Sequence, residues 1–302
     1  MADNLAFDKE SRARPRPKVS VVVPVYNGEA TIEDCVNSLL QMDFPASELE
    51  IIVVDNASVD DTGKILGRFN DRIQVVHETK RGAAAARNRG VVSARGEIVA
   101  FTDADCVVEP GWLANLVTPL TEESIGIIGG KILAKRPCNP IEEFGESIHD
   151  HDQAINVYEP PHVITMNWAS RVSVLRENLF DEKFLRSQDV DLSYRILQRG
   201  YRFVFAPAAV VYHQNEKTFA GLFKEGFTHG LHSVQLIKKH KAFLATRHRE
   251  RIDRQAYRAL AISLKDYLAG RKRDFAICTF TFNLGKRIGK VSGSFRYGYL
   301  DL

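Results

Sequence analysis

Short runs of apolar residues alternate with helical patterns along the first hundred positions of the chain. The runs hold few polar residues, as is typical of strands that are covered on both faces, and they lie at 19–24, 51–55, 73–76 and 98–102. The segments between them have apolar side chains at helical spacing or are rich in alanine, at 32–40, 65–69 and 82–94. This alternation predicts an α/β fold with a mostly parallel sheet, right-handed crossovers and helices on both faces.

The pattern is less regular between residues 106 and 161. It predicts a helix face at 112–120 and a strand with a bend at 125–132. Residues 137–161 are rich in proline and polar side chains and are predicted to form a loop. The segment His149-Asp150-His151-Asp152 within it has the residue types of a metal site, but a polar surface loop is the favoured interpretation.

A second helix and two strands are predicted before residue 215. Apolar side chains at helical spacing indicate a helix over 184–199, and Gly200 is expected to end it. Strand-like runs follow at 201–206 and 209–212, and they end at His213.

Two carboxylates follow the fourth apolar run. Asp103 and Asp105 are two residues apart, so their side chains can point to the same side of an extended backbone. The carboxyl edge of an open α/β sheet is also where ligands bind. Because two close carboxylates repel each other, a cation is expected between them, and Mg²⁺ or Mn²⁺ prefers oxygen ligands and can bridge to a phosphate. A lone Asp-x-Asp is more often a solvated turn, and it is the neighbouring motifs that favour a metal site here.

The usual phosphate-binding motifs are absent from this half of the chain. No G-x-G-x-x-G follows the first strand, and no G-x-x-x-x-G-K-[ST] occurs in the 302 residues. A nucleotide would therefore need another means of balancing its phosphate charge, and a metal held by the Asp-Ala-Asp segment could supply it.

The cysteines and the N-terminus indicate a reducing compartment. The four cysteines are far apart without C-x-x-C spacing, which favours neither a disulfide framework nor a zinc site. Residues 1–17 are polar and charged and lack the apolar core of a signal peptide, so they are expected to form a mobile tail. We expect a cytoplasmic protein.

Charge is distributed unevenly along the chain. Residues 1–216 carry 23 Lys and Arg against 32 Asp and Glu, whereas residues 217–302 carry 18 against 6. A basic final third indicates an anionic partner such as a membrane surface, a nucleic acid or a phosphorylated substrate. A solvated face, or contact with the acidic body, explains the pattern equally well.

The basic final third also contains two apolar stripes at helical spacing. The first is formed by Phe219, Leu222, Phe223, Phe227, Leu231 and Val234, and the second by Tyr257, Leu260, Ala261, Leu264 and Leu268. The apolar run 275–284 is too short to span a bilayer, which needs about 20 residues. Such basic amphipathic helices predict binding to an anionic membrane surface, in slight preference to packing on the body or in a dimer. No helix-turn-helix, RRM or zinc pattern supports nucleic-acid binding.

Five motifs in order resemble the family 2 glycosyltransferases of the GT-A fold. They are residues 19–27, VVDNAS at 53–58, GAAAARNRG at 82–90, EIVAFTDADC at 97–106 and DVDLSYRILQRG at 189–200. The resemblance implies a GT-A domain over 18–215, with a nucleotide-sugar half at 18–106 and an acceptor half at 107–215. Residues 216–302 then form a basic, helical extension.

The resemblance implies a role for specific residues on the donor side. The turn after the first strand, together with one acidic residue, is expected to contact the nucleotide: Pro24, Val25, Tyr26, Asn27 and Glu29. Asp55 is expected at the nucleobase, Arg87 at the base or the phosphates, and Asp103 with Ala104 at the ribose or the metal. Asp105 is expected to bind the metal, and His213 to lie near the metal or the diphosphate.

The resemblance assigns the catalytic base to Asp189. The family's E-D dipeptide is Gln188-Asp189 here, so only the Asp carries over, and Gln188 is assigned to the acceptor side. Asn167, Trp168 and Arg171 lie where the family often lines the cleft between donor and acceptor.

Structural alternatives remain for four of these residues. Arg87 and Arg89 could both be solvated helix positions, so only one of them need have a role. Asp189 could cap its helix or pair with Arg195, Asp55 could form an Asx turn with Ser58, and His213 could be a hydrogen-bonded structural histidine.

The predicted activity is a metal-dependent, inverting transfer of a sugar from a nucleotide-sugar to a hydroxyl group. The cofactor is expected to be Mn²⁺ or Mg²⁺, the donor a UDP-sugar, and the acceptor a glycan or a lipid-linked glycan at the inner face of the membrane. A polyprenyl-phosphate sugar synthase and a non-catalytic protein that binds nucleotide-sugars are the alternatives. The sequence carries no signal for an oligomeric state.

Overall fold

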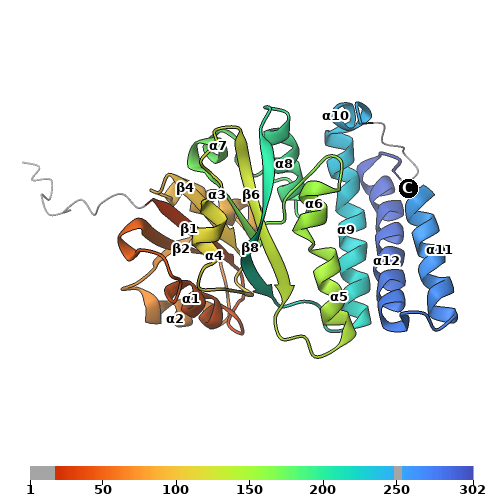
Figure 1. The fold of residues 1–302 in the computed structure, drawn as a ribbon, viewed down its shortest axis with the longest axis horizontal. Coiled ribbons are helices and arrows are strands. Elements are labelled where there is room, and N and C mark those ends of the chain that lie inside the picture. Colours follow the sequence, from red (N-terminus) through yellow and green to blue (C-terminus); the bar gives the residue numbers. More distant parts are fainter. Residues whose placement is uncertain (1–17, 248–253, 302) are drawn as a thin grey trace, which may run out of the picture.

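The computed structural model describes residues 18–247 and 254–301, so the tail predicted at 1–17 lies outside the described residues. One sheet of eight strands forms the centre of the molecule, in the order β3-β2-β1-β4-β7-β6-β8-β5. Helices cover both of its faces, and the C-terminal helices stand in a separate layer at one side (Figure 1). The predicted α/β class is confirmed.

The first half of the sheet is parallel, as the sequence predicts. Its strands are β1 (Val19–Val25), β2 (Leu49–Asp55), β3 (Gln74–His77) and β4 (Ile98–Thr102). The helices between them are α1 (Ile32–Leu40), α2 (Thr62–Leu66) and α3 (Ala83–Ser93). Short 3₁₀ turns, Ala46–Glu48 and Gly67–Phe69, complete the connections. Strand β1 pairs in parallel with both β2 and β4, so the ends of all three strands lie at one edge.

The second half of the sheet contains antiparallel pairs. Its strands are β5 (Cys106–Val108), β6 (Ile125–Ala134), β7 (Asn167–Arg171) and β8 (Arg202–His213). Strand β7 runs antiparallel to β4 and β6, and β5 runs antiparallel to β8, whereas β6 and β8 are parallel. The two strands expected at 201–206 and 209–212 are one strand, β8, with a register shift against β6 between them.

Five helices belong to this half, and two of them replace a predicted loop. They are α4 (Trp112–Val117), α5 (Pro140–Ile148), α6 (His151–Asn156), α7 (Val172–Glu177) and α8 (Gln188–Leu197). The loop prediction for 137–161 is wrong over α5 and α6, because its turn-forming residues are helix caps. Asn139 accepts hydrogen bonds from the first turn of α5, Pro140 takes its first position, and Asp150 caps α6.

The core has one cluster of apolar side chains on each face of the sheet. Helices α1 and α4 pack on one face through side chains such as Leu39 and Trp112, and α3, α7 and α8 pack on the other through side chains such as Val91, Leu175 and Leu192. Because the strands are covered on both faces, their continuous apolar runs are explained.

Four helices form the C-terminal segment: α9 (Phe219–Lys239), α10 (Lys241–Ala245), α11 (Arg254–Leu268) and α12 (Arg273–Tyr297). Figure 1 shows α12 between α9 and α11. The first apolar stripe lies on α9, and apart from Phe219 its side chains are buried or partly buried within the protein. That stripe is therefore not a membrane-binding face, whereas Leu264 and Leu268 of the second stripe are exposed on α11. In the described part of the chain, no helix has the length and apolar character needed to cross a bilayer.

Glycines bring α9 and α12 into backbone contact. A Cβ atom on Gly226 or Gly230 would lie 2.2 or 2.0 Å from the carbonyl oxygen of Phe282 or Lys286 on α12. Gly285, Gly289 and Gly293 of α12 face carbonyl oxygens of α9 in the same way. Residues later in α9 contact residues later in α12, so the two helices run in the same direction. Only a residue without a side chain permits this approach.

This packing predicts a large effect for a small substitution. Gly230→Ala should lower the free energy of unfolding by about 1–3 kcal/mol, because the new methyl group must displace the backbone of α12. Gly63→Ala is the matched control, since nothing lies within 4 Å of its added Cβ and alanine is the better helix former. Urea unfolding measures both variants, and an unchanged midpoint for Gly230→Ala would contradict the close approach of the helices.

Candidate active site

The Asp-Ala-Asp segment lies at the edge where β4 ends, as predicted. It joins β4 to β5, and all three of its residues are partly exposed. The side chain of Arg87, from α3, is buried and donates from Nη2 to Oδ1 of Asp103 at 2.9 Å. Its Nε and Nη1 atoms are also buried, and no described residue forms a hydrogen bond with them. A buried guanidinium with unused donors beside a sheet edge is suited to bind an anionic ligand.

Asp105 and His213 lie together at this edge. Antiparallel pairing of β5 with β8 places Cys106 opposite His213, and the Nε2 atom of His213 is 3.5 Å from Oδ2 of Asp105. The Nδ1 atom of His213 is 2.7 Å from Oδ1 of Asn215, which orients the ring. Burial would lower the pKa of His213, but the hydrogen bond and charge of Asp105, with help from Asn215, raise it to about 9. An oxygen and an imidazole nitrogen at this separation suit two ligands of one divalent ion.

Two histidines and a glutamate extend this site toward the C-terminal segment. The rings of His149 and His213 meet edge to face with centroids 5.1 Å apart. The Nε2 atom of His149 is 3.5 Å from Oε1 of Glu225 on α9, and the Nε2 atom of His229, one turn further along α9, is 3.9 Å from the same oxygen. A continuous row of polar side chains therefore joins Asp105 to α9.

The turn after β1 is locked against the segment after β2. The backbone amide of Asn27 donates to Ser58, and its side-chain Oδ1 accepts from the amide of Val59. Glu29 accepts from the amide of Asp61, and Arg81 donates to the hydroxyl of Tyr26 while its guanidinium covers that ring. The structure thus gathers the predicted nucleotide-contacting residues after β1 in one exposed wall, with Val25 buried beneath them.

Asp55 forms the Asx turn with Ser58 that was the structural alternative for this residue. Its Oδ1 accepts from the amide of Ser58 at 3.0 Å, which is the Asx turn, and its Oδ2 lies 3.5 Å from Nδ1 of His77. The side chain is largely buried at the end of β2, next to the wall that Asn27 and Ser58 form. A nucleobase role for Asp55 stays a prediction.

Asp189 is held near the start of α8 without an ionic partner. Ser187, with a left-handed backbone of φ 61°, is the residue at the helix N-cap. The Oδ1 atom of Asp189 accepts only from the amide of Val190, and no Lys, Arg or His among residues 18–247 and 254–301 forms an ion pair with it. The predicted alternative of a pair with Arg195 is wrong, because Arg195 bonds to Asp191.

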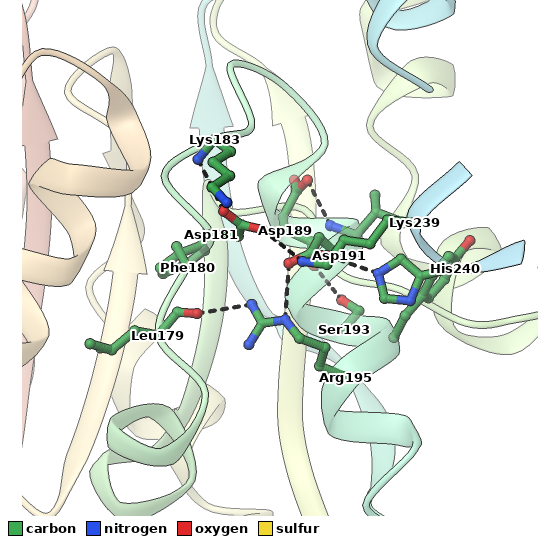
Figure 2. A network of polar contacts seen from close by, with 12 residues as sticks. Leu179, Phe180, Asp181, Lys183, Asp189, Asp191, Ser193, Arg195, Lys239 and His240 are labelled. Carbon is green, nitrogen blue, oxygen red and sulfur yellow. Dashed lines mark hydrogen bonds and ion pairs between the residues drawn. The ribbon is translucent and has the colours of Figure 1, made fainter. Parts of the chain in front are cut away.

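Asp191, in contrast, is fully buried in a network of charges (Figure 2). Its Oδ1 lies 2.6 Å from Nζ of Lys239 and 2.8 Å from Nε2 of His240, and its Oδ2 accepts from Nε of Arg195 at 3.0 Å. Lys239 also bonds to Asp181. Burial would raise the pKa of Asp191, but its partners hold the pKa below the ordinary value. Asp191 therefore ties α8 to the end of α9.

The structure gives most of the acceptor-side residues other partners. Asn167 is buried and bonds to Trp112 and to the carbonyls of Lys131 and Ala209, and Trp168 is buried in a stack with Phe101. Arg171 donates to three backbone carbonyls and faces Ile98 at the start of β4. At about 3.3 Å per residue, that position is roughly 16 Å from the Asp-Ala-Asp segment. Gln188 is buried at the first position of α8. These placements indicate that the four residues support the candidate site from within the fold and do not line it.

The His149–Asp152 segment is not the surface loop that we predicted. His149 ends α5 and His151 begins α6, and both side chains are buried. His151 lies against the Gly130 carbonyl through Nδ1 and the Ile164 amide through Nε2. Burial lowers the pKa of His151 to about 3, so the ring is neutral. Within the described ranges, no three His, Cys, Asp or Glu side chains form a ready-made metal cluster.

Sequence analysis missed three residues of this region: Glu225, His229 and His162. Glu225 and His229 are four residues apart on α9, a spacing that was visible in the sequence but was interpreted only through the apolar stripe. Burial lowers the pKa of His162 and of His229; the charge of Asp189 raises that of His162, and Lys286 lowers both further.

The network around Asp191 yields a stability prediction. Asp191→Asn should lower the free energy of unfolding by about 3 kcal/mol, because it removes the fully buried carboxylate that Arg195, Lys239 and His240 share. The control is Asp71→Asn, whose side chain is 80% exposed, so its pair with Arg72 contributes little. Chemical denaturation compares the two, and equal losses would show that the buried network does not stabilise the fold.

Comparison with known proteins identifies the family. The model of glycosyl transferase family 2 matches residues 20–179. Glycosyltransferase AglE of Haloferax volcanii is 28% identical over 231 residues, which cover 73% of this chain and 74% of that protein. Pre-mycofactocin glycosyltransferase of Mycobacterium tuberculosis is 28% identical over 221 residues, which cover 67% of this chain but only 45% of that protein.

Solved structures share the fold. A mannosyltransferase from Pyrobaculum calidifontis, solved with GDP-Man and Mn²⁺, has a TM-score of 0.68 at 24% identity, covering 91% of this chain and 87% of that one. Glucosyl-3-phosphoglycerate synthase from M. tuberculosis, solved with Mn²⁺, UDP and phosphoglyceric acid, has a TM-score of 0.54 at 23% identity, covering 74% and 78%. The sheet, the helices on both faces and the matched motifs agree with these findings: the chain belongs to glycosyl transferase family 2 and is a glycosyltransferase of the GT-A fold.

Proposed function

We propose that this enzyme transfers a sugar from a nucleotide-sugar to an acceptor hydroxyl with inversion at the anomeric carbon, in a reaction that depends on a divalent metal. The observation that carries the proposal is the Asp105–His213 pair at the end of β4, with buried Arg87 bonded to Asp103 of the same segment. At the start of α8, the carboxylate of Asp189 has no cation partner among the described residues. The mannosyltransferase and the synthase that share the fold are solved with Mn²⁺ and a guanosine or uridine nucleotide, which supports the donor class.

On the donor side, the residues present fit a metal-bound diphosphate. Asp105 and His213 would hold Mn²⁺ or Mg²⁺, and the bound ion would balance the negative charge that grows on the leaving diphosphate. The unused Nε and Nη1 donors of Arg87 supply further positive charge beside Asp103. The wall of Tyr26, Asn27 and Glu29 against residues 55–61 would contact the base and the ribose. Uridine is the base that we propose.

On the acceptor side, Asp189 is the proposed general base. It accepts the proton of the acceptor hydroxyl while that oxygen attacks the anomeric carbon, and the bond from that carbon to the diphosphate oxygen breaks. Attack from the face opposite the diphosphate inverts the configuration. Asp189 has no cation partner among the described residues, whereas Asp191 is fully buried and bonded to Arg195, Lys239 and His240, so Asp191 does not fit this role.

Two substitutions separate binding from chemistry. Asp189→Asn should lower turnover by about 10²–10⁴-fold and leave nucleotide binding unchanged, because only proton transfer is lost. Asp105→Ala should abolish metal-dependent binding. UDP at about a hundred times its dissociation constant, with Mn²⁺, should add about 2.7 kcal/mol to the stability of the parent protein, and a thermal shift assay detects this.

The same assay with GDP, dTDP and CMP tests the choice of base. Asp71→Asn is the control, because its exposed carboxylate lies on the surface beyond α2. Full turnover in Asp189→Asn would remove Asp189 as the base. If none of the four nucleotides binds in the presence of metal, the metal-dependent mechanism is wrong.

We also propose that the acceptor is a glycan or a lipid-linked glycan that is presented at the inner, anionic face of the membrane, where the enzyme binds peripherally. The outer helix α11 exposes Tyr257, Ile262, Leu264 and Leu268, the last to 76%. Arg271, Lys272 and Arg273 follow it and are exposed. Exposed apolar side chains beside a basic run are suited to the interface of an anionic bilayer.

Flotation with liposomes tests the membrane proposal. The protein should float with vesicles that contain phosphatidylglycerol and should be released by high salt. Leu264→Asp with Leu268→Asp should abolish flotation, whereas Val92→Asp, at an exposed apolar position on α3, should not. Equal flotation of all these proteins, or none by the parent protein, would rule out α11 as the membrane-binding face.

A further inference from the structure

The metal pair is the inner end of a longer row of polar side chains. From Asp105 the row passes to His213, then to His149 at the end of α5, and then to Glu225 on α9. Each neighbour is in contact with the next, and the row crosses from the sheet to the C-terminal segment. The apolar stripe of α9 gives no reason for a carboxylate at this position, so Glu225 needs an explanation of its own.

Glu225 lies where a charge is costly unless it has partners. Its side chain is only 15% exposed, and its carboxylate faces His149 and His229. Burial would raise its pKa, but the hydrogen bond and charge of His149, together with the charges of His229 and His213, keep the pKa below the ordinary value. Glu225 is therefore an ionised acceptor in contact with the Nε2 atom of His149.

His149 has one nitrogen with a partner and one without. The side chain is 11% exposed, its Nε2 faces Glu225, and its Nδ1 is buried without a hydrogen-bond partner among the described residues. When Nε2 donates to the carboxylate, Nδ1 carries the lone pair and can accept a hydrogen bond. Buried polar atoms are rarely left unpaired, so a group that is absent from the protein alone is expected there.

Helix α9 is held rigidly enough to place these side chains. Gly226 and Gly230 lie beside Glu225 and His229 in the sequence, and both are in backbone contact with α12. Lys239 and His240, at the far end of α9, bind Asp191 of α8. The position of Glu225 is therefore fixed from both sides.

We propose that Glu225 and His149 form the outer layer of the metal site, with Glu225 orienting His149 and His149 orienting His213. Both are positioning residues, and the inference rests on the proposed metal-dependent function. The arrangement matches the way carboxylates orient histidines around metal ions, and the free Nδ1 of His149 suits a water of the ion's hydration shell. The C-terminal segment then contributes to donor binding, because its residue Glu225 helps to position the metal ligand His213.

Metal affinity tests this inference separately from activity. Calorimetric titration of the protein with Mn²⁺ in the presence of UDP should show about 10–100-fold weaker binding in Glu225→Gln and in His149→Gln. The unfolding free energy without metal, measured by urea, separates an effect on the ion from an effect on folding. Glu143→Gln is the matched control, since it makes the same change at an exposed position of α5.

The outcomes distinguish the two proposals. Parent-like Mn²⁺ affinity in either folded variant overturns the inference and leaves the proposed function standing. A parent protein that binds no Mn²⁺ with UDP, GDP or dTDP overturns the metal-dependent function, and the inference with it. Weaker binding in both variants, with Glu143→Gln unchanged, supports the outer layer. At saturating Mn²⁺ the turnover of Glu225→Gln should return to that of the parent protein, because a defect confined to metal binding is overcome by excess metal.

Discussion

The site depends on the register between β5 and β8. Because Cys106 lies opposite His213, the residue before the short strand and the last residue of the long one meet at the same edge, and Asp105 and His213 come within 3.5 Å. A slip of one residue would turn His213 to the other face of the sheet. Parallel pairing of β6 with β8 holds the long strand, so His213 is positioned by the sheet, while Asp105 lies in the segment that joins β4 to β5.

Buried charge connects the C-terminal segment to the catalytic domain. Lys239 and His240 bond to Asp191 on the helix that carries Asp189, and Lys217 approaches Glu142 on α5. Part of the excess positive charge after residue 216 thus pairs with the acidic body, which was one of the two explanations that the sequence allowed. The remaining exposed cations around residue 272 are those that a membrane surface could use.

The sequence predicts those features of the structure that depend on residues close together in the chain. The apolar runs predicted β1 to β4 nearly to the residue, and the order of the motifs indicated the family. Asp105 and His213 lie together as expected, while the roles of these two residues and of Asp189 stay predictions. The row through His149 and Glu225 could not be predicted, because it joins residues that are distant in sequence. The glycines of α9 and α12 are regularly spaced in the sequence. Their role in close helix packing could not be predicted, because the sequence does not identify which helix each one contacts. Helices α5 and α6 were missed because their caps have the composition of turns.

The acidic residues at the site divide into those that support the fold and those that remain available for ligands. One oxygen of Asp103 is bonded to Arg87, whereas Asp105 is partly exposed beside a histidine. Asp191 is buried and bonded to Arg195, Lys239 and His240, while Asp189, two residues earlier on the same helix, has no cation partner in the described structure. In both cases the sequence shows two equivalent carboxylates, and only their surroundings distinguish them. The helix periodicity explains the second case: positions two residues apart point to different sides of α8, so one side chain faces α9 and the other does not.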